Sequence, residues 1–417
     1  MTVLALDIGS SSVRAQRFDE HAEPAGELRQ ERYDTQDAAE VARLVREVCA
    51  GEEPDATSCF AHSLVAVDRS WTPLSPILGW RDTRSAEAAE WLRRRLDGEA
   101  VHARTGGYLH PSFWPAKLAW LAQVDPECFR DAAHFVSFSD FVRGTPETSL
   151  SMASATGLLD LTTNAWDAQL LDALGLDEER LPRIVEQPVW LDAACSNLGA
   201  GCVGPERAAL MVGTSGALRV LYETERPQPR EGLFLYRYDE RRVIEGGALS
   251  DGGNLHRWLE QTLAETDADP RELAVTVLPF LGGERSTGWD PDMTGAILGL
   301  TFDTTPADIR RAALEGVGYR FAAIDELLPD VQEIVATGGA VAKAPAWVQI
   351  MADALARPVV LSGVAEASLR GAAVAVVADP AEAPLDRTFH PREERAEAYR
   401  WARERQQRLY EVLHGEL

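Results

Sequence analysis

The sequence predicts an α/β protein built from two related domains, and three observations support this prediction. Residues 3–18 read as a strand, a turn of glycine and serine and a returning strand, and residues 208–220 repeat that layout. The chain has 417 residues, which is more than one hydrophobic core of usual size organises. Apolar residues make up 45% of it, as in a globular protein rather than a disordered one.

The first hairpin begins with the apolar run 3–8, which favours a short buried strand and contains Asp7. The turn that follows, Gly-Ser-Ser-Ser at 9–12, directs backbone N–H groups and hydroxyls inward, as a phosphate chain requires. Asp7 at the strand end can hold Mg²⁺, because this ion prefers oxygen ligands and keeps much of its water. Taken alone, the stretch also suits an ordinary hairpin whose serines form the turn.

The second hairpin matches the first residue by residue. Its run 212–215, Val-Gly-Thr-Ser, aligns with Ile-Gly-Ser-Ser at 8–11, and Met211 falls where Asp7 stands in the first copy. The second turn can therefore cradle phosphate but cannot bind a metal ion. Two such hairpins suggest two related domains that close on one nucleotide.

Charge and composition exclude several classes of partner. The net charge of −25 argues against nucleic acid and anionic membranes, because neutralising phosphate requires a basic face. The N-terminus has no basic region, and no apolar run approaches the roughly 18 residues of a membrane helix, so we expect a cytoplasmic protein. Five cysteines without CxxC spacing predict reduced structural thiols, with neither zinc nor disulfides.

Helical and strand patterns alternate through the first half. Residues 37–49 have helical spacing, and residues 59–67 read as a buried strand interrupted by His62. A lone histidine in a strand is commonly a satisfied core residue, yet near a cleft its imidazole can meet a substrate hydroxyl. Residues 80–84 open a helix, which Asp82 or Thr83 caps in the structural alternative.

Asp192 follows a short apolar run and precedes a glycine turn. A carboxylate that leaves a strand toward a cleft is placed as a general base, and phosphoryl transfer to an alcohol uses one to accept the hydroxyl proton.

The second half contains the longest helical pattern, residues 308–328, which we expect to cross the sheet of the second domain. A glycine-rich stretch at 245–254 leads into a helix, and residues 331–340 read as a strand followed by two glycines. These glycines permit an adenine ring or ribose to lie on the backbone, although a tight turn also explains them. Residues 345–355 predict a helix, and the C-terminal segment predicts a charged, solvated one.

With these motifs in order, the chain is identified as a member of the FGGY carbohydrate kinase family. The matching stretches are DIGSS at 7–11, WRDTR at 80–84, HPSFWPAK at 110–117, Asp192 with NLGAG at 197–201, GTSG at 213–216, GER at 283–285 and TGGA at 337–340. The resemblance implies two actin-like ATPase (ribonuclease H-like) domains with an interdomain cleft. Residues 1–207 would form the N-terminal, sugar-side domain with the metal-site acid, and residues 208–417 the C-terminal, ATP-side domain. Within the family, residues 62–68, 151–157 and 246–253 are most similar to bacterial gluconate kinases.

Position in the family motifs implies a role for each site residue. Asp192 is similar to the catalytic base and Asp7 to the metal-site acid. The residues similar to the family's ATP site are Gly9, Ser10, Ser11, Gly213, Thr214, Ser215, Gly253, Gly338, Gly339 and Ala340. Those at the sugar pocket are His62, Trp80, Asp82 and Ser112. The chain departs from the family where Asp192 lies between Leu191 and Ala193 rather than among glycines.

The sequence therefore predicts an ATP-dependent, Mg²⁺-requiring kinase for the terminal hydroxyl of a sugar or sugar acid, with gluconate to 6-phosphogluconate as the leading reaction. A ketose or polyol kinase and a nucleotide-binding protein without transfer activity are the alternatives. A dinucleotide-dependent dehydrogenase is set aside, because no GxGxxG joins a strand to a helix near the N-terminus. A sugar acid needs a cation, and Arg81, Arg84 and Lys117 are the nearest in sequence, although solvated salt bridges also explain them. The oligomeric state is open, and a homodimer is compatible with the sequence.

Overall fold

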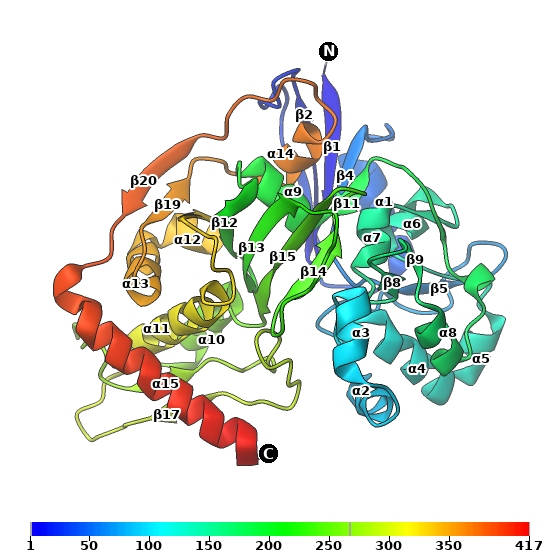
Figure 1. Cartoon of the computed structure of the whole chain (residues 1–417). Coiled ribbons are helices and arrows are strands. Elements are labelled where there is room, and N and C mark those ends of the chain that lie inside the picture. The colour runs from blue at the N-terminus through cyan, green and yellow to red at the C-terminus, as the bar shows by residue number, and fades with distance from the viewer. Residues whose placement is uncertain (1, 267, 417) are drawn as a thin grey trace.

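A computed structural model describes residues 2–266 and 268–416, and two β-sheets organise them (Figure 1). The first sheet has the strand order β11-β4-β1-β2-β3 and the second has the order β14-β15-β13-β12-β18-β19-β20. The strands of the first sheet are β1 (Val3–Ile8), β2 (Ser12–Phe18), β3 (Arg29–Arg32), β4 (Ala56–Cys59) and β11 (Val189–Leu191). Those of the second are β12 (Gly204–Val212), β13 (Gly216–Glu223), β14 (Phe234–Arg237), β15 (Arg242–Leu249), β18 (Glu333–Thr337), β19 (Val359–Ser362) and β20 (Leu385–Phe389).

The two sheets share one topology around their hairpins. Strand β1 pairs antiparallel with β2 and parallel with β4, whereas β12 pairs antiparallel with β13 and parallel with β18. In each sheet, the first strand of the hairpin therefore has its second strand on one side and a parallel strand on the other. This topology confirms the internal repeat that the sequence predicts.

Helices cover the sheets where the sequence pattern places them. Helix α1 (Ala38–Val48) starts after Asp37, whose carboxylate accepts from the backbone N–H groups of its first turn. The predicted long helix is α11 (Pro306–Asp325), which begins with a capping box between Thr305 and Asp308. Its apolar side shares a core with β13, and the predicted helix at 345–355 is α13 (Pro345–Leu355).

The remaining helices and strands complete both halves of the chain. The helices are α2 (Ala86–Arg93), α3 (Gly98–Thr105), α4 (Trp114–Val124), α5 (Pro126–Asp131), α6 (Phe138–Arg143), α7 (Leu150–Ser154), α8 (Ala168–Leu174), α9 (Asp192–Gly199), α10 (Gly253–Thr262), α12 (Gly339–Lys343), α14 (Ala367–Val374) and α15 (Ala396–Glu416). The short strands are β5 (Val65–Val67), β6 (His134–Val136), β7 (Glu147–Thr148), β8 (Leu159–Asp160), β9 (Ala165–Trp166), β10 (Arg183–Ile184), β16 (Thr276–Leu278) and β17 (Ala296–Leu298).

Two helices from distant parts of the sequence meet between the sheets (Figure 1). Helices α9 and α14 approach backbone to backbone, because a Cβ built on Gly199 would lie 1.8 Å from the Ala367 carbonyl oxygen. A Cβ on Gly371 would lie 1.7 Å from that of Cys195, so only glycine permits the contact on either helix. This contact fixes the position of α9, whose first residue is Asp192.

Two expectations about elements are wrong. The strand expected over 59–67 is broken, because His62 has a φ of 63°, which a strand cannot accommodate, and β5 pairs with β6 in a separate ribbon. The C-terminal helix α15 is not simply solvated, because Tyr399, Ala402 and Tyr410 are buried on one side of it.

Helices that could cross a membrane, long and apolar enough for a bilayer, do not occur in the described part of the chain.

Candidate active site

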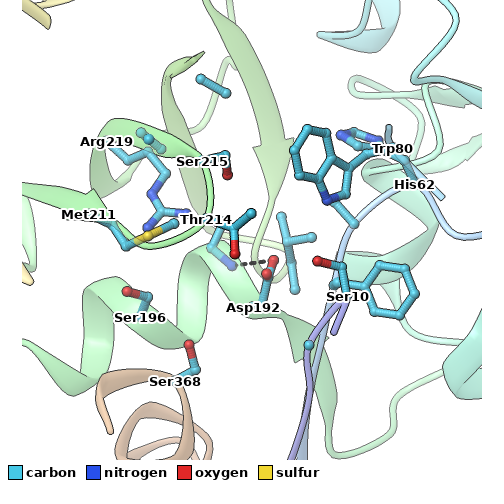
Figure 2. Close-up of a pocket in the computed structure, with 18 of the residues that line it drawn as sticks. Ser10, His62, Trp80, Asp192, Ser196, Met211, Thr214, Ser215, Arg219 and Ser368 are labelled. Atoms are coloured by element: carbon cyan, nitrogen blue, oxygen red, sulfur yellow. Dashed lines mark hydrogen bonds between the residues drawn. The ribbon is translucent and has the colours of Figure 1, made fainter. Parts of the chain in front are cut away.

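A cavity of about 220 Å³ lies between the two hairpin turns, and Asp192 lies near its centre (Figure 2). Many of the residues predicted for the site line it, namely Asp7, Gly9, Ser10, Ser11, His62, Trp80, Asp192, Thr214 and Ser215. Residues from both sheets and from α9 therefore face one space.

Asp192 begins α9 directly after β11, so the end of a strand and the start of a helix aim its side chain at the cavity. Its Oδ1 accepts a hydrogen bond from the backbone N–H of Ala193 at 2.8 Å. Burial raises the pKa of Asp192 to about 6, and the negative charge of Asp7 acts in the same direction, whereas Arg219 opposes them. A carboxylate with a pKa close to neutrality can accept a hydroxyl proton.

Asp7 lies at the end of β1, buried, with both oxygens in use. Oδ1 accepts from the Ser58 hydroxyl at 2.7 Å, and Oδ2 lies 2.9 Å from Nη2 of Arg14. Arg14 also forms an ion pair with Glu366, from just before α14. The sequence does not predict the pair between Arg14 and Asp7, which places a cation beside the predicted metal ligand.

The donor set is suited to Mg²⁺ only if the nucleotide contributes to it. No group of three or more histidine, cysteine or acidic side chains that could hold a metal ion occurs among the described residues. Asp7 and Asp192 do line the same cavity, and Mg²⁺ is commonly held by one or two carboxylates, water and substrate phosphates. The residues present therefore fit a Mg²⁺ ion that arrives with ATP.

The two turns present hydroxyls on opposite sides of Asp192, with Ser10 on one side and Thr214 on the other (Figure 2). Each turn is closed by one backbone hydrogen bond, from Gly9 to Ser12 and from Gly213 to Ser215. Closure through the backbone leaves the hydroxyls free to contact a ligand.

Four residues predicted for the adenosine side do not line this cavity but adjoin the second turn. The Gly253 N–H donates to the Gly213 carbonyl at 2.8 Å, and a Cβ on Gly253 would lie 3.4 Å from that of Ala340. Gly338 has a φ of 103° and touches the Val212 backbone, whereas a Cβ on Gly339 would meet nothing within 4 Å. Gly253 and Gly338 therefore adjoin the second turn through backbone contacts.

His62 presents a buried acceptor on the side of the cavity where the sequence predicts the sugar. Its Nδ1 lies 2.6 Å from the Ala155 carbonyl oxygen, and its Nε2 is buried without a partner. Burial holds the pKa of His62 well below its usual value, so the ring is neutral, Nδ1–H donates and Nε2 accepts. A substrate hydroxyl can donate to Nε2.

Asp82 and Ser112 are outside the cavity, unlike the other two residues predicted for the sugar pocket. The Ser112 hydroxyl donates to the Trp80 carbonyl at 3.0 Å and so positions that residue. The Asp82 carboxylate accepts from Arg84, and α2 begins after Ser85, so the helix-cap alternative for Asp82 and Thr83 is wrong.

None of the three cations expected near a substrate carboxylate lines the cavity, although the Arg81 guanidinium lies 5.3 Å from the ring centroid of Trp80, which does. Arg84 is paired with Asp82, and Lys117 is buried with its Nζ donating to the carbonyls of His62 and Leu78. The arginines that line the cavity are Arg14, Arg219 and Arg285. Arg219 had a signal in the sequence, because it is the one charge within the apolar run 217–221.

The fold and the cavity define a two-domain protein of the actin-like ATPase type, with hydroxyl turns from both halves facing a carboxylate. The chain belongs to the FGGY family of carbohydrate kinases: the family's N-terminal domain matches residues 56–197 and its C-terminal domain residues 208–378. It is 31% identical to the xylulose kinase of Streptomyces rubiginosus, over 75% of this chain and 71% of that protein. It is 28% identical to the gluconokinase of Bacillus subtilis, again over 75% of this chain and 71% of the relative. The crystal structure of gluconate kinase from Lactobacillus acidophilus has the same fold, with a TM-score of 0.86, 22% identity and coverage of 99% of this chain and 98% of that one.

Proposed function

We propose that this carbohydrate kinase uses MgATP to phosphorylate the terminal hydroxyl of a sugar acid, with D-gluconate to 6-phosphogluconate as the leading reaction. The observation that carries the transfer step is Asp192, a carboxylate with a raised pKa between two hydroxyl turns. Gluconate is favoured by the gluconokinase relatives and by the cations that face the cavity of a strongly acidic protein.

In this proposal the sugar lies beside His62 and Trp80, and the γ-phosphate lies between the two turns. The Nε2 atom of His62 accepts from a sugar hydroxyl, and Trp80 provides an apolar face. The guanidinium of Arg285 lies 5.0 Å from the Trp80 ring centroid and has no carboxylate partner among the described residues, so it is free to meet the acid group.

Asp192 then takes the proton of the terminal hydroxyl as the oxygen attacks the γ-phosphorus. The N–H groups and hydroxyls of the turns at 9–12 and 213–215 stabilise the phosphate oxygens. Asp7 would hold Mg²⁺, directly or through water, and the ion would neutralise phosphate charge when it is bound. The glycines beside the second turn, Gly253, Gly338 and Gly339, would support adenosine.

A coupled assay of ADP release across gluconate, xylulose, ribulose, glycerol, sorbitol and glucose tests this proposal. Gluconate should show the highest kcat/KM, far above its uncharged relatives sorbitol and glucose, because an arginine that faces the cavity can pair with the carboxylate of gluconate. A neutral polyol or ketose that turns over better would overturn the sugar-acid assignment. It would favour the second candidate, a ketose or polyol kinase, which the xylulose kinase relative at 31% identity supports.

A further inference from the structure

Arg219 is a buried charge without an ion pair among the residues that the structure describes. It lies in the middle of β13 between Leu218 and Val220, and only 4% of its surface is exposed. A charged side chain in the interior costs several kcal/mol unless other groups pair with it and satisfy its hydrogen bonds. Such a residue needs either a partner within the fold or a ligand.

Asp192 acts on Arg219 through its charge alone, and the described residues supply neither an ion pair nor a hydrogen bond for the guanidinium nitrogens Nε and Nη2. Nε and Nη2 of Arg219 are buried without a hydrogen bond, and no ion pair of Arg219 occurs within the described ranges. Its carbonyl oxygen accepts from the Asn197 side chain at 3.0 Å, which ties β13 to α9 without using the guanidinium. Burial lowers the pKa of Arg219 to about 10, so the group is still a cation at neutral pH.

The position of the guanidinium identifies the kind of ligand. It lies beside Met211 and Thr214, on the side of Asp192 away from Trp80 and His62 (Figure 2). That is the side of the second turn, 213–215, rather than the proposed sugar side. In the first hairpin, Asp7 stands at the position that matches Met211. Asp7 forms an ion pair with Arg14, so the arginine of the first hairpin is neutralised, unlike Arg219.

We propose that Arg219 is a catalytic residue that binds the transferring phosphoryl group. This inference rests on the proposed phosphoryl transfer but not on the identity of the sugar. As the sugar oxygen bonds to the γ-phosphorus, the bond from that phosphorus to the β–γ bridging oxygen breaks, and ADP leaves with the electron pair. The hydroxyl proton goes to Asp192, and Arg219 keeps its protons while its fork of N–H groups holds two equatorial phosphoryl oxygens.

Such a contact acts mainly in the transition state, where charge spreads over the equatorial oxygens. Because the guanidinium is already desolvated and held by β13, little reorganisation is needed when the phosphoryl group moves. Arg219 therefore has the chemistry of an arginine finger supplied by the same chain.

The test compares Arg219→Met, which removes the charge at similar volume, with Arg219→Lys, which keeps a charge but loses the planar fork. Arg207→Met is the matched control, because Arg207 lies on the neighbouring strand β12 outside the cavity, paired with Glu333. With the acceptor that the wild type uses best, Arg219→Met should lower kcat about 100- to 1,000-fold, with Arg219→Lys intermediate and the control unchanged. Calorimetry should show unchanged ADP affinity but at least tenfold weaker binding of ADP with Mg²⁺ and aluminium fluoride, a mimic of the transferring group.

Thermal unfolding separates this role from a structural one. Removing an unpaired buried charge should leave the melting temperature of Arg219→Met at or above that of the wild type. A lower melting temperature with parallel loss of ADP binding would overturn the proposal, as would a loss confined to the KM of sugar acids, which would assign Arg219 to the acceptor carboxylate. The aluminium fluoride measurement needs no sugar, so the proposal can fail or stand even if gluconate is not the substrate.

Discussion

Asp192 is the side chain whose charge state we expect to set the rate of transfer. Asp192→Asn should leave ADP binding nearly intact and lower kcat about 100- to 10,000-fold, because the amide keeps the volume but cannot accept the proton. Since burial raises the pKa of Asp192 to about 6, the wild-type rate should fall as the pH drops below that value. Rate–pH profiles of both proteins check this, and a variant with wild-type turnover would show that another acid is the base.

The raised pKa of Asp192 also affects the free energy of unfolding. Its pH dependence is opposite to that of a carboxylate whose pKa is lowered by an ion pair. The unfolded Asp192 loses its proton near the ordinary aspartate pKa of 3.8, and the folded one near 6. Between these values the folded state binds more protons, so this group's contribution to stability decreases as the pH rises through the window. Asp192→Asn should therefore be at least as stable as the wild type at pH 7, as chemical denaturation at pH 4 and pH 7 would reveal.

Asp7 should matter through the metal rather than through proton transfer. Asp7→Ala removes the carboxylate at the end of β1 beside the first turn and leaves Arg14 without its buried partner, so we expect a higher Mg²⁺ requirement and weaker productive MgATP binding. Titration of activity with Mg²⁺ at fixed ATP measures the first effect, and ADP binding without Mg²⁺ serves as the control. An unchanged Mg²⁺ titration would show that Asp7 does not bind the metal and that the first hairpin has only a structural role.

At this scale, chemistry that is local in sequence could be predicted and chemistry assembled across the fold could not. Ser10 and Thr214 stand out because turn residues at a strand end carry their own signal. Arg219 is visible as a charge within an apolar run, but its lack of an ion pair depends on what packs around it, and the Arg14–Glu366 pair joins segments that are far apart in sequence. His62 was expected within a strand, because a positive φ at a non-glycine residue has no sequence signature.

At the scale of elements, the contact between α9 and α14 controls where Asp192 points. Gly371→Ala should destabilise the protein by about 1–3 kcal/mol or more, because its Cβ would lie 1.7 Å from the Cys195 carbonyl oxygen. Relief of that clash moves α9, so kcat should fall at saturating substrate as well. Denaturant unfolding and steady-state kinetics measure the two effects.

Gly98→Ala is the matched control for this substitution, because Gly98 is at the start of α3 and a Cβ there meets nothing within 4 Å. It should change neither quantity by much. If Gly371→Ala lost stability but kept its wild-type kcat, the α9–α14 contact would be structural only. The sequence indicates small residues on both helices but not their meeting, since 171 residues separate the bonded pair Arg370 and Gly199.

At the scale of the whole molecule, the two halves divided at residues 207 and 208 share a core, because an element of the second half packs on the sheet of the first. Helix α14 belongs to the second half of the sequence, yet Leu369, Ala372 and Ala373 share a buried core with Ala5 of β1 and Cys195 of α9. Arg370 also donates to the Gly199 carbonyl at 2.8 Å. The first sheet is therefore covered in part by a helix that begins about 175 residues after its last strand.

This arrangement predicts how fragments of the chain behave. Residues 1–207 expressed alone should be molten or insoluble, because the apolar side of β1 and α9 loses the cover that α14 provides. Co-expression with residues 208–417 should restore a folded complex, detectable by co-purification, sharp thermal unfolding and recovered kinase activity. A fragment 1–207 that unfolds cooperatively on its own would contradict this, and would mean that α14 contributes to the position of α9 rather than to the integrity of the first sheet.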